Sequence, residues 1–190
     1  MVQGSPAARP RPSRVVDTHQ IGTEGMLVSL SADAAECRTL ADVNGLVRIE
    51  SLQADMELRR EGRTGIHVTG TVRARITQTC VVTLDDFVTD LAEPVDVHFL
   101  PEREAAARAA EAARLAASPS DAGRVADDLP DAMVDGKIDL ASVMAEFLAL
   151  GLDPYPRKPG AAFVELAPAA GEPEVSPFAA LARLKSERPN

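Results

Sequence analysis

The longest two-residue alternation in the chain runs from Ile66 to Leu84, and it constrains the fold more than any other feature. Apolar residues take nearly every even position of this segment, and polar residues take most of the odd ones. This alternation of apolar and polar residues is typical of an antiparallel strand with one face on the core and the other in solvent. Only Gly70 and Gln78 interrupt the apolar set. Because the segment is longer than most strands, we expect a bend or hairpin turn near residues 77–79.

Two neighbouring segments repeat the alternation and predict further strands of the same sheet. Residues 46–60 change phase part-way, which indicates a bulge near Ser51. Residues 87–99 carry their apolar side chains at odd positions. Because the segments 46–60, 66–84 and 87–99 follow one another with short turns, an antiparallel meander is the economical topology.

Two segments have the periodicity and the end signals of packed helices. Asp33 and Glu36 have the spacing of a capping box, and Gly45 provides a stop. The second helix is predicted over residues 135–152, with Asp139 as its N-cap. The predicted fold class is therefore α+β: an antiparallel sheet, which could curl toward a barrel, with two packed helices and a helical insertion.

Composition shifts along the 190 residues predict one α+β domain over residues 14–163 with three appendages. Residues 1–13 are expected to be a flexible tail. Residues 101–130 form an Ala-rich, acidic insertion that begins with a solvated helix. Residues 164–190 are expected to be a Pro-rich linker and a short amphipathic helix capped by Ser176.

Three motifs carry a family resemblance: ITQTCVVTLDDF, VDVHF, and GKIDLASVMAEFLALGLDPYPRKPGAAF. Together they resemble the YceD family of large ribosomal RNA accumulation proteins, over roughly residues 14–163 and the terminal SPFAALARLK. The resemblance implies a non-enzymatic factor that bacteria need for normal 23S ribosomal RNA levels.

The composition limits which partners the protein could bind. A net charge of −9 argues against coating nucleic acid non-specifically, because such affinity comes from neutralising many phosphates. Aromatic residues make up 3% of the chain and Trp is absent, which disfavours an extended stacking platform for single strands. No apolar run reaches the ~20 residues of a membrane span, and no signal peptide is evident, so the cytoplasm is the expected compartment.

The cysteines predict neither a metal site nor a nucleophile. Many YceD relatives carry Cys-x-x-Cys at the strand turn and a second pair after the last helix. Here Cys80 is present, but Thr83 occupies the position of the second cysteine, and the later pair is missing. A tetrahedral site needs about four N or S donors, so we expect no metal and no cofactor. His67 and His98 occupy outward positions whereas Cys80 is inward, and the three histidines are dispersed. We therefore predict no enzyme, with a thiol-dependent or hydrolytic enzyme as the remote rival.

Basic side chains near the central strand are the candidate binding residues. Arg73 and Arg75 share the outward face at a spacing of some 6–7 Å, which could match neighbouring phosphates. With other residues they could form one patch for RNA or a protein partner. The alternative is solvated arginines paired with acids such as Asp55, Glu57 and Glu61. The candidate residues are Arg59, Arg60, Arg63, Arg73, Arg75, Tyr155, Arg157 and Lys158.

The segment DPYPRKPG predicts a stiff loop that displays its side chains at low entropic cost. The resulting hypothesis is a factor that supports 23S ribosomal RNA accumulation and large-subunit assembly by binding precursor RNA or a large-subunit ribosomal protein. The alternative is an acidic adaptor or chaperone that holds a basic ribosomal protein without touching RNA. Neither hypothesis includes a membrane or a small-molecule substrate.

Overall fold

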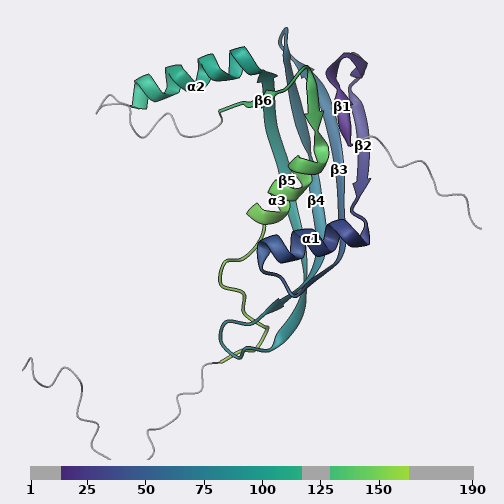
Figure 1. Ribbon diagram of the computed structural model, residues 1–190, viewed down its shortest axis with the longest axis vertical. Coiled ribbons are helices and arrows are strands. Elements are labelled where there is room, and N and C mark those ends of the chain that lie inside the picture. The colour runs from purple at the N-terminus through teal and green to yellow at the C-terminus, as the bar shows by residue number, and fades with distance from the viewer. Residues whose placement is uncertain (1–13, 117–128, 163–190) are drawn as a thin grey trace, which may run out of the picture.

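The computed structural model describes residues 14–116 and 129–162, which form a long sheet with helices on one side (Figure 1). The elements in chain order are β1 (Val15–Asp17), a 3-10 turn η1 (Thr18–Gln20), β2 (Met26–Ser31), α1 (Ala34–Asn44), β3 (Arg48–Glu61), β4 (Gly65–Thr79), β5 (Asp86–Pro101), α2 (Glu102–Ala116), β6 (Asp131–Met133), β7 (Lys137–Asp139) and α3 (Leu140–Leu150).

The main sheet has the strand order β2-β3-β4-β5-β6, and β1 pairs with β7 in a separate two-stranded sheet. Neighbouring strands of the main sheet are antiparallel except for β5 and β6, which are parallel. The predicted meander and the α+β class are confirmed. Curling toward a barrel is not confirmed, because within the described residues β2 and β6 end the sheet at opposite edges.

The central strand is shorter than the alternation predicted. β4 ends at Thr79, and residues 80–85 form the turn to β5, so the extension of the strand to Leu84 was wrong. Two backbone hydrogen bonds close this turn: the Cys80 N–H donates to the Asp85 carbonyl at 2.8 Å, and the Leu84 N–H donates to the Cys80 carbonyl at 2.9 Å. The turn thus lies a few residues beyond the predicted site at 77–79.

The phase change in the preceding strand is a bulge, as predicted. The pairing of β3 with β4 shifts between Ile49 and Ser51, after which Leu52 and the following even residues face inward with those of β4. Gly70, which breaks the apolar set of β4, pairs with Met56 of β3.

Both predicted helices form, and their ends follow the sequence signals. The Asp33–Glu36 capping box starts α1, and Gly45 ends it in the left-handed region with φ 66°. Asp139 caps α3 as predicted, but the helix starts at Leu140 and not at residue 135. The reason is that residues 137–139 pair with β1, an interaction with residues far away in the sequence.

Helices α1 and α3 cover one face of the sheet, and the core lies between them and the strands (Figure 1). Apolar side chains at even positions of β3 and β4 supply the sheet side of this core. The opposite face, which we call the outer face, carries polar and charged side chains that the described residues leave largely exposed. The largest fully buried side chains are Ile21, Leu52, Met56, Leu58, Ile66, Ile76, Ile138, Leu140, Met144, Leu148, Val68 and Val72.

The predicted helix of the insertion is present as α2, which projects from the end of β5 (Figure 1). Of its described side chains only Ala105 is buried, so the helix is solvated as predicted. No helix among the described residues is long and apolar enough to cross a membrane. The predictions for residues 1–13, for the acidic segment at 117–128 and for the C-terminal helix lie outside the described residues.

Candidate interaction sites

Arg73 and Arg75 lie side by side on the outer face, as predicted, but each already has a carboxylate partner. The Arg73 guanidinium contacts Asp55 at 3.1 Å, and that of Arg75 contacts Asp90 at 3.0 Å. Both arginines are more than half exposed. Exposed pairs of this kind contribute about 0–1 kcal/mol, so they neutralise charge more than they stabilise the fold.

The three arginines near the β3–β4 turn differ in their roles. Arg59 pairs with Glu57 at 2.7 Å, and this carboxylate raises the pKa of the guanidinium. Arg60 donates to the backbone carbonyls of Ile21 and Thr18 at 2.9 and 3.0 Å, so it ties β3 to the 3-10 turn. Arg63 lies in the turn itself and lines a hollow of about 790 Å³ between that turn and α2.

The prediction of one continuous basic patch is wrong. Arg63 precedes β4, whereas Lys158 contacts Asp85 just beyond its other end, at 3.3 Å. The 15 residues of β4 separate these positions by roughly 45–50 Å at the usual rise per residue. The candidate basic residues are therefore spread along the length of the sheet, with Arg73 and Arg75 between the two ends.

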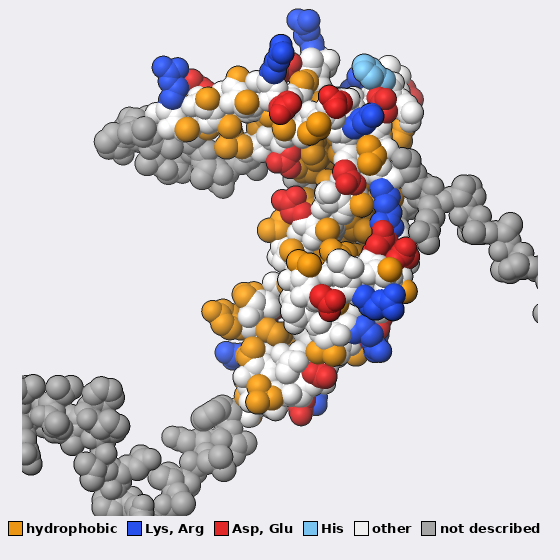
Figure 2. Space-filling view, in the orientation of Figure 1, with side chains coloured by type: hydrophobic (Ala, Val, Ile, Leu, Met, Phe, Trp, Pro, Cys, Tyr) orange, Lys and Arg blue, Asp and Glu red, His pale blue; other side chains and the backbone are white. Residues whose placement is uncertain are grey.

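The outer face as a whole carries more carboxylates than arginines, and this count opposes a basic surface. Figure 2, which shows the side that carries the helices, likewise has acidic and basic side chains interspersed and no single basic area. On β3, β4 and β5 the outward arginines are Arg48, Arg59, Arg73 and Arg75, whereas the outward carboxylates are Glu50, Asp55, Glu57, Glu61, Asp86, Asp90 and Asp96.

At the far end of the sheet, two segments distant in sequence form one unit, which we call the tip: the β4–β5 turn (80–85) and the loop after α3 (151–162). They lie side by side at the lower end of Figure 1. The Val81 N–H donates to the Pro156 carbonyl at 2.9 Å, and the Lys158 ammonium contacts Asp85. Gly151 begins the loop against β5, where an added Cβ would lie 3.1 Å from atoms of Glu93 and Leu91. These contacts fix the loop on the turn.

The Cys80 thiol is fully buried inside the tip and accepts hydrogen bonds from both of its segments. The Thr83 hydroxyl is the main cause that lowers the pKa of this thiol to about 7. Backbone N–H groups of Lys158, Thr83 and Val82 act in the same direction, while burial opposes them. Thr83, at the position where relatives were expected to carry a cysteine, thus binds the sulfur. The predicted buried thiol is confirmed.

The tip exposes a mixed apolar and basic surface. Leu84 is 78% exposed and Tyr155 is 71% exposed, beside Arg157 and Lys158. Leu84 also adopts φ 61°, a left-handed conformation that costs a branched apolar residue energy and is often found at functional positions. Tyr155, Arg157 and Lys158 were candidates from the sequence, but Leu84 was missed because the alternation placed it inside the strand.

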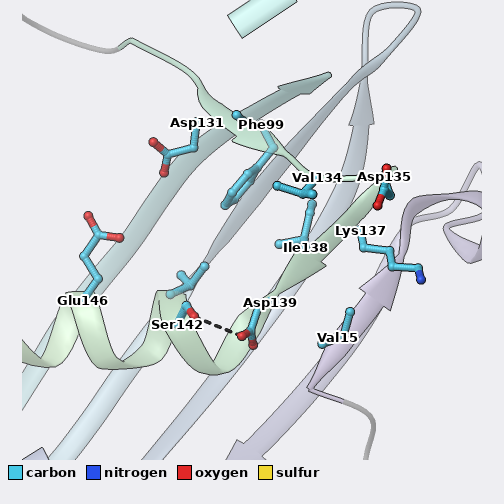
Figure 3. A pocket seen from close by; sticks show the side chains of 12 residues that line it. Val15, Phe99, Asp131, Val134, Asp135, Lys137, Ile138, Asp139, Ser142 and Glu146 are labelled. Carbon is cyan, nitrogen blue, oxygen red and sulfur yellow. Dashed lines mark hydrogen bonds between the residues drawn. The ribbon is translucent and has the colours of Figure 1, made fainter. Parts of the chain in front are cut away.

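A second feature that the sequence did not reveal is a hollow of about 510 Å³ between β6, β7 and α3. Figure 3 shows Asp131 and Glu146 pointing toward the same end of it, and Ser142 donates to the Asp139 carboxylate at 3.0 Å. The sequence contained one signal for this hollow, because residues 139, 142 and 146 have the spacing of side chains on one face of a helix. The charged side chains lining the hollow are Asp131, Asp135, Lys137, Asp139 and Glu146, so carboxylates predominate.

Comparison with known proteins places the chain in a family. The family model described as "Large ribosomal RNA subunit accumulation protein YceD" matches residues 68–185, more than half of the chain. The chain belongs to the YceD family. No curated protein and no solved structure matches the chain.

The YceD match covers both segments of the tip, the whole of α3 and most of β4. It therefore includes Arg73, Arg75, Tyr155, Arg157 and Lys158. Three other candidates precede it: Arg59, Arg60 and Arg63. Within the YceD region, three candidates lie together on the loop of the tip, which is fixed to the β4–β5 turn: Tyr155, Arg157 and Lys158.

Proposed function

We propose that this YceD protein is a non-enzymatic factor that supports 23S ribosomal RNA accumulation during assembly of the large ribosomal subunit. It acts in the cytoplasm by binding precursor ribosomal RNA through the tip. Membership of a family described by large ribosomal RNA accumulation supports the ribosomal role. The Cys80 environment fits a non-catalytic role, because its sulfur is buried and its partners are hydrogen-bond donors and not a base.

The observation that carries the proposal is the exposure of Tyr155, Arg157 and Lys158 on a loop fixed to the β4–β5 turn. Proteins that recognise unpaired RNA stack bases on aromatic rings and place cations against phosphates. One tyrosine ring beside two cations provides both contacts on a small scale. The surface ion pair of Lys158 with Asp85 contributes about 0–1 kcal/mol, so a phosphate can replace the carboxylate at little cost.

Arg73 and Arg75 are secondary contacts in this proposal. Each is held by a carboxylate on an adjacent strand. A phosphate that approached them would also meet Asp55 and Asp90, which oppose its charge. At the tip Lys158 is also paired, with Asp85, but Arg157 forms no ion pair with another described residue, so it is the cation most available to a phosphate and the tip should provide the larger share of RNA affinity.

The test measures binding of the full-length protein to transcripts of precursor 23S ribosomal RNA over a salt series. Arg157→Glu with Lys158→Glu should weaken binding at least tenfold and reduce the salt slope by about 2. Arg73→Glu with Arg75→Glu should have a smaller effect. The control, Arg103→Glu with Arg108→Glu, makes the same charge change on the projecting helix α2. Equal losses from the tip and α2 variants would show that the tip has no special role.

A second candidate is the acidic adaptor that holds a basic ribosomal protein, and the carboxylate-lined hollow of Figure 3 favours it. Purification of tagged protein from lysate, with and without RNase, separates the two proposals. A basic ribosomal protein retained after RNase, and lost with Asp131→Asn plus Glu146→Gln, would support the adaptor. Recovery of ribosomal RNA that depends on Arg157 and Lys158 would support the tip.

A further inference from the structure

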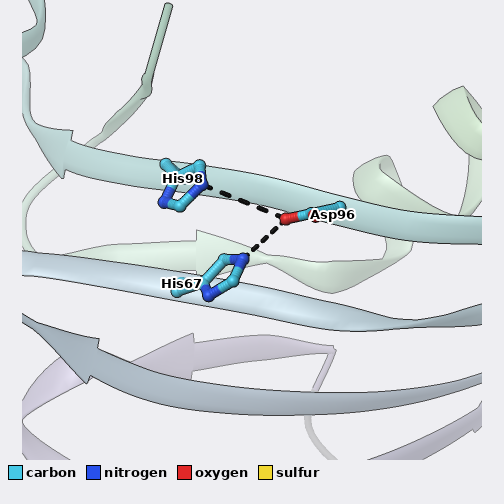
Figure 4. A group of neighbouring side chains, drawn as sticks. All are labelled: His67, Asp96 and His98. Carbon is cyan, nitrogen blue, oxygen red and sulfur yellow. Dashed lines mark hydrogen bonds and ion pairs between the residues drawn. The ribbon is translucent and has the colours of Figure 1, made fainter. Parts of the chain in front are cut away.

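Two imidazole rings and a carboxylate meet on the outer face, at the end of the sheet opposite the tip (Figure 4). His67 on β4 is the direct partner of His98 on β5 in the strand register, and Asp96 lies two residues before His98 on the same face. The rings stack with centroids 4.2 Å apart and an angle of 5° between their planes. The histidines are thus dispersed in sequence, but strand pairing brings two of them together.

The donor atoms of these three residues converge. Asp96 Oδ1 is 2.6 Å from His67 Nε2 and 4.0 Å from His98 Nε2. One ligand atom from each residue lies within 4.8 Å of the others. Donors that share one tetrahedral ion at about 2.0–2.1 Å lie about 3.3 Å from each other. The two separations from Asp96 lie on either side of that value, and the donor atoms of the two histidines lie within 4.8 Å of each other, so side-chain movements on the order of 1–1.5 Å would bring all three donors around one ion.

We propose that His67, Asp96 and His98 form a binding site for a divalent transition-metal ion of the zinc class. Two imidazoles and a carboxylate are a donor set that such ions accept, whereas Mg²⁺ and Ca²⁺ prefer oxygen ligands. Three protein ligands leave a fourth position for water or for a group of a bound partner. The prediction of no metal considered cysteine ligands, and this site contains none.

Glu61 supplies an independent reason to assign a metal site. Its Oε2 lies 2.7 Å from His98 Nδ1, on the side of the ring away from Asp96. Metal-bound histidines usually donate their other ring N–H to a carboxylate, which fixes the tautomer and raises the basicity of the ligand nitrogen. A proton on Nδ1 leaves the lone pair on Nε2, so that this nitrogen of His98 can act as the ligand. Glu61 is therefore a positioning residue.

Strand pairing fixes the backbone of the three ligands, while their imidazole and carboxylate groups stay accessible to solvent. His67 and His98 are register partners near the ends of β4 and β5, and their side chains are 31% and 38% exposed. The Asp96 side chain is 73% exposed, so the fourth position faces solvent. The site is thus preorganised by the sheet and open to exchange. The metal site shares no residue with the tip, so its test is independent of the proposed RNA contact.

The test is calorimetric titration of the full-length protein with Zn²⁺. We expect one ion per chain, and His67→Gln, His98→Gln or Asp96→Asn should weaken binding more than 100-fold. Glu61→Gln should weaken it about 10- to 100-fold, as removal of such carboxylate partners does. His19→Gln is the matched control, because His19 is the third histidine, is exposed on η1 and should not affect binding.

Thermal unfolding of each variant checks that it folds. Asp96→Asn keeps the test decisive if a histidine variant does not fold, because this side chain is largely exposed. Absence of Zn²⁺ binding by the natural sequence, or unchanged affinity in the folded Asp96→Asn and His98→Gln variants, would overturn the proposal.

Discussion

Gly70 is the residue at which a single added carbon should damage the sheet most. A Cβ at this position would lie 2.1 Å from the Asp55 carbonyl oxygen, 2.9 Å from Met56 Cα and 3.1 Å from Asp55 C. Ordinary contacts of a Cβ begin near 3.4 Å. All three atoms belong to the backbone of β3, so no side chain can rotate away. The Gly70→Ala change therefore requires β3 and β4 to separate by more than 1 Å.

The cost follows from the hydrogen bonds and the packing at that point. Separation would weaken about two ladder hydrogen bonds, each worth about 1 kcal/mol. It would also strain the packing around Met56 by about 1–3 kcal/mol, as overpacking does elsewhere. The total loss in the free energy of unfolding should be about 3–5 kcal/mol. For a domain of this size the midpoint of thermal unfolding should fall by roughly 6–20 °C.

Urea and thermal unfolding followed by circular dichroism measure this loss. Gly22→Ala is the matched control, because a Cβ there meets no atom within 4 Å and its φ lies outside the left-handed region. The control should change stability by about 0.5 kcal/mol or less. A loss below about 1 kcal/mol for Gly70→Ala would refute the close approach of the two strands.

Three further predictions concern the buried thiol, the start of α1 and the core. The pKa of Cys80 is lowered from 9.0 to about 7 in the folded protein, so its contribution to stability should be complete above about pH 9 and should disappear as the pH falls through 7. Cys80→Ala should abolish this pH dependence in urea titrations, and an unchanged profile would contradict the assignment. The ion pair with Arg14 lowers the pKa of Glu36, so Glu36→Gln should cost about 0.5–1 kcal/mol at neutral pH, and the difference should vanish as acid protonates Glu36. Leu148→Ala should cost about 2–5 kcal/mol, whereas Leu150→Ala on the same helix should cost almost nothing, because Leu148 is fully buried and Leu150 is 64% exposed.

Local patterns predicted the elements whose information lies within a few residues. The alternation identified β3, β4 and β5, and the phase change identified the bulge near Ser51. The spacing of Asp33 and Glu36 identified the start of α1. These signals succeed because a period of two and a capping box are properties of a short stretch of chain.

Features that depend on distant segments could not be predicted in the same way. β7 is three residues long and exists through its pairing with β1, so its residues were assigned to the following helix. The position of Leu84 depends on hydrogen bonds that close the turn with Cys80. The meeting of His67 with His98 requires the register of β4 against β5, because a shift of one residue would turn one ring to the other face.

The parallel pairing of β5 with β6 returns the chain to the place where it left the sheet. Phe99 lies opposite Asp131 and Pro101 lies opposite Met133, so the ends of the intervening excursion are held as neighbours. The entropy of closing such an excursion grows slowly with its length, by about 0.6 kcal/mol for each doubling. Evolution or an engineer can therefore lengthen, shorten or replace the segment between these anchors while the rest of the architecture stays in register. This makes the junction a natural place to graft a reporter or a second binding module.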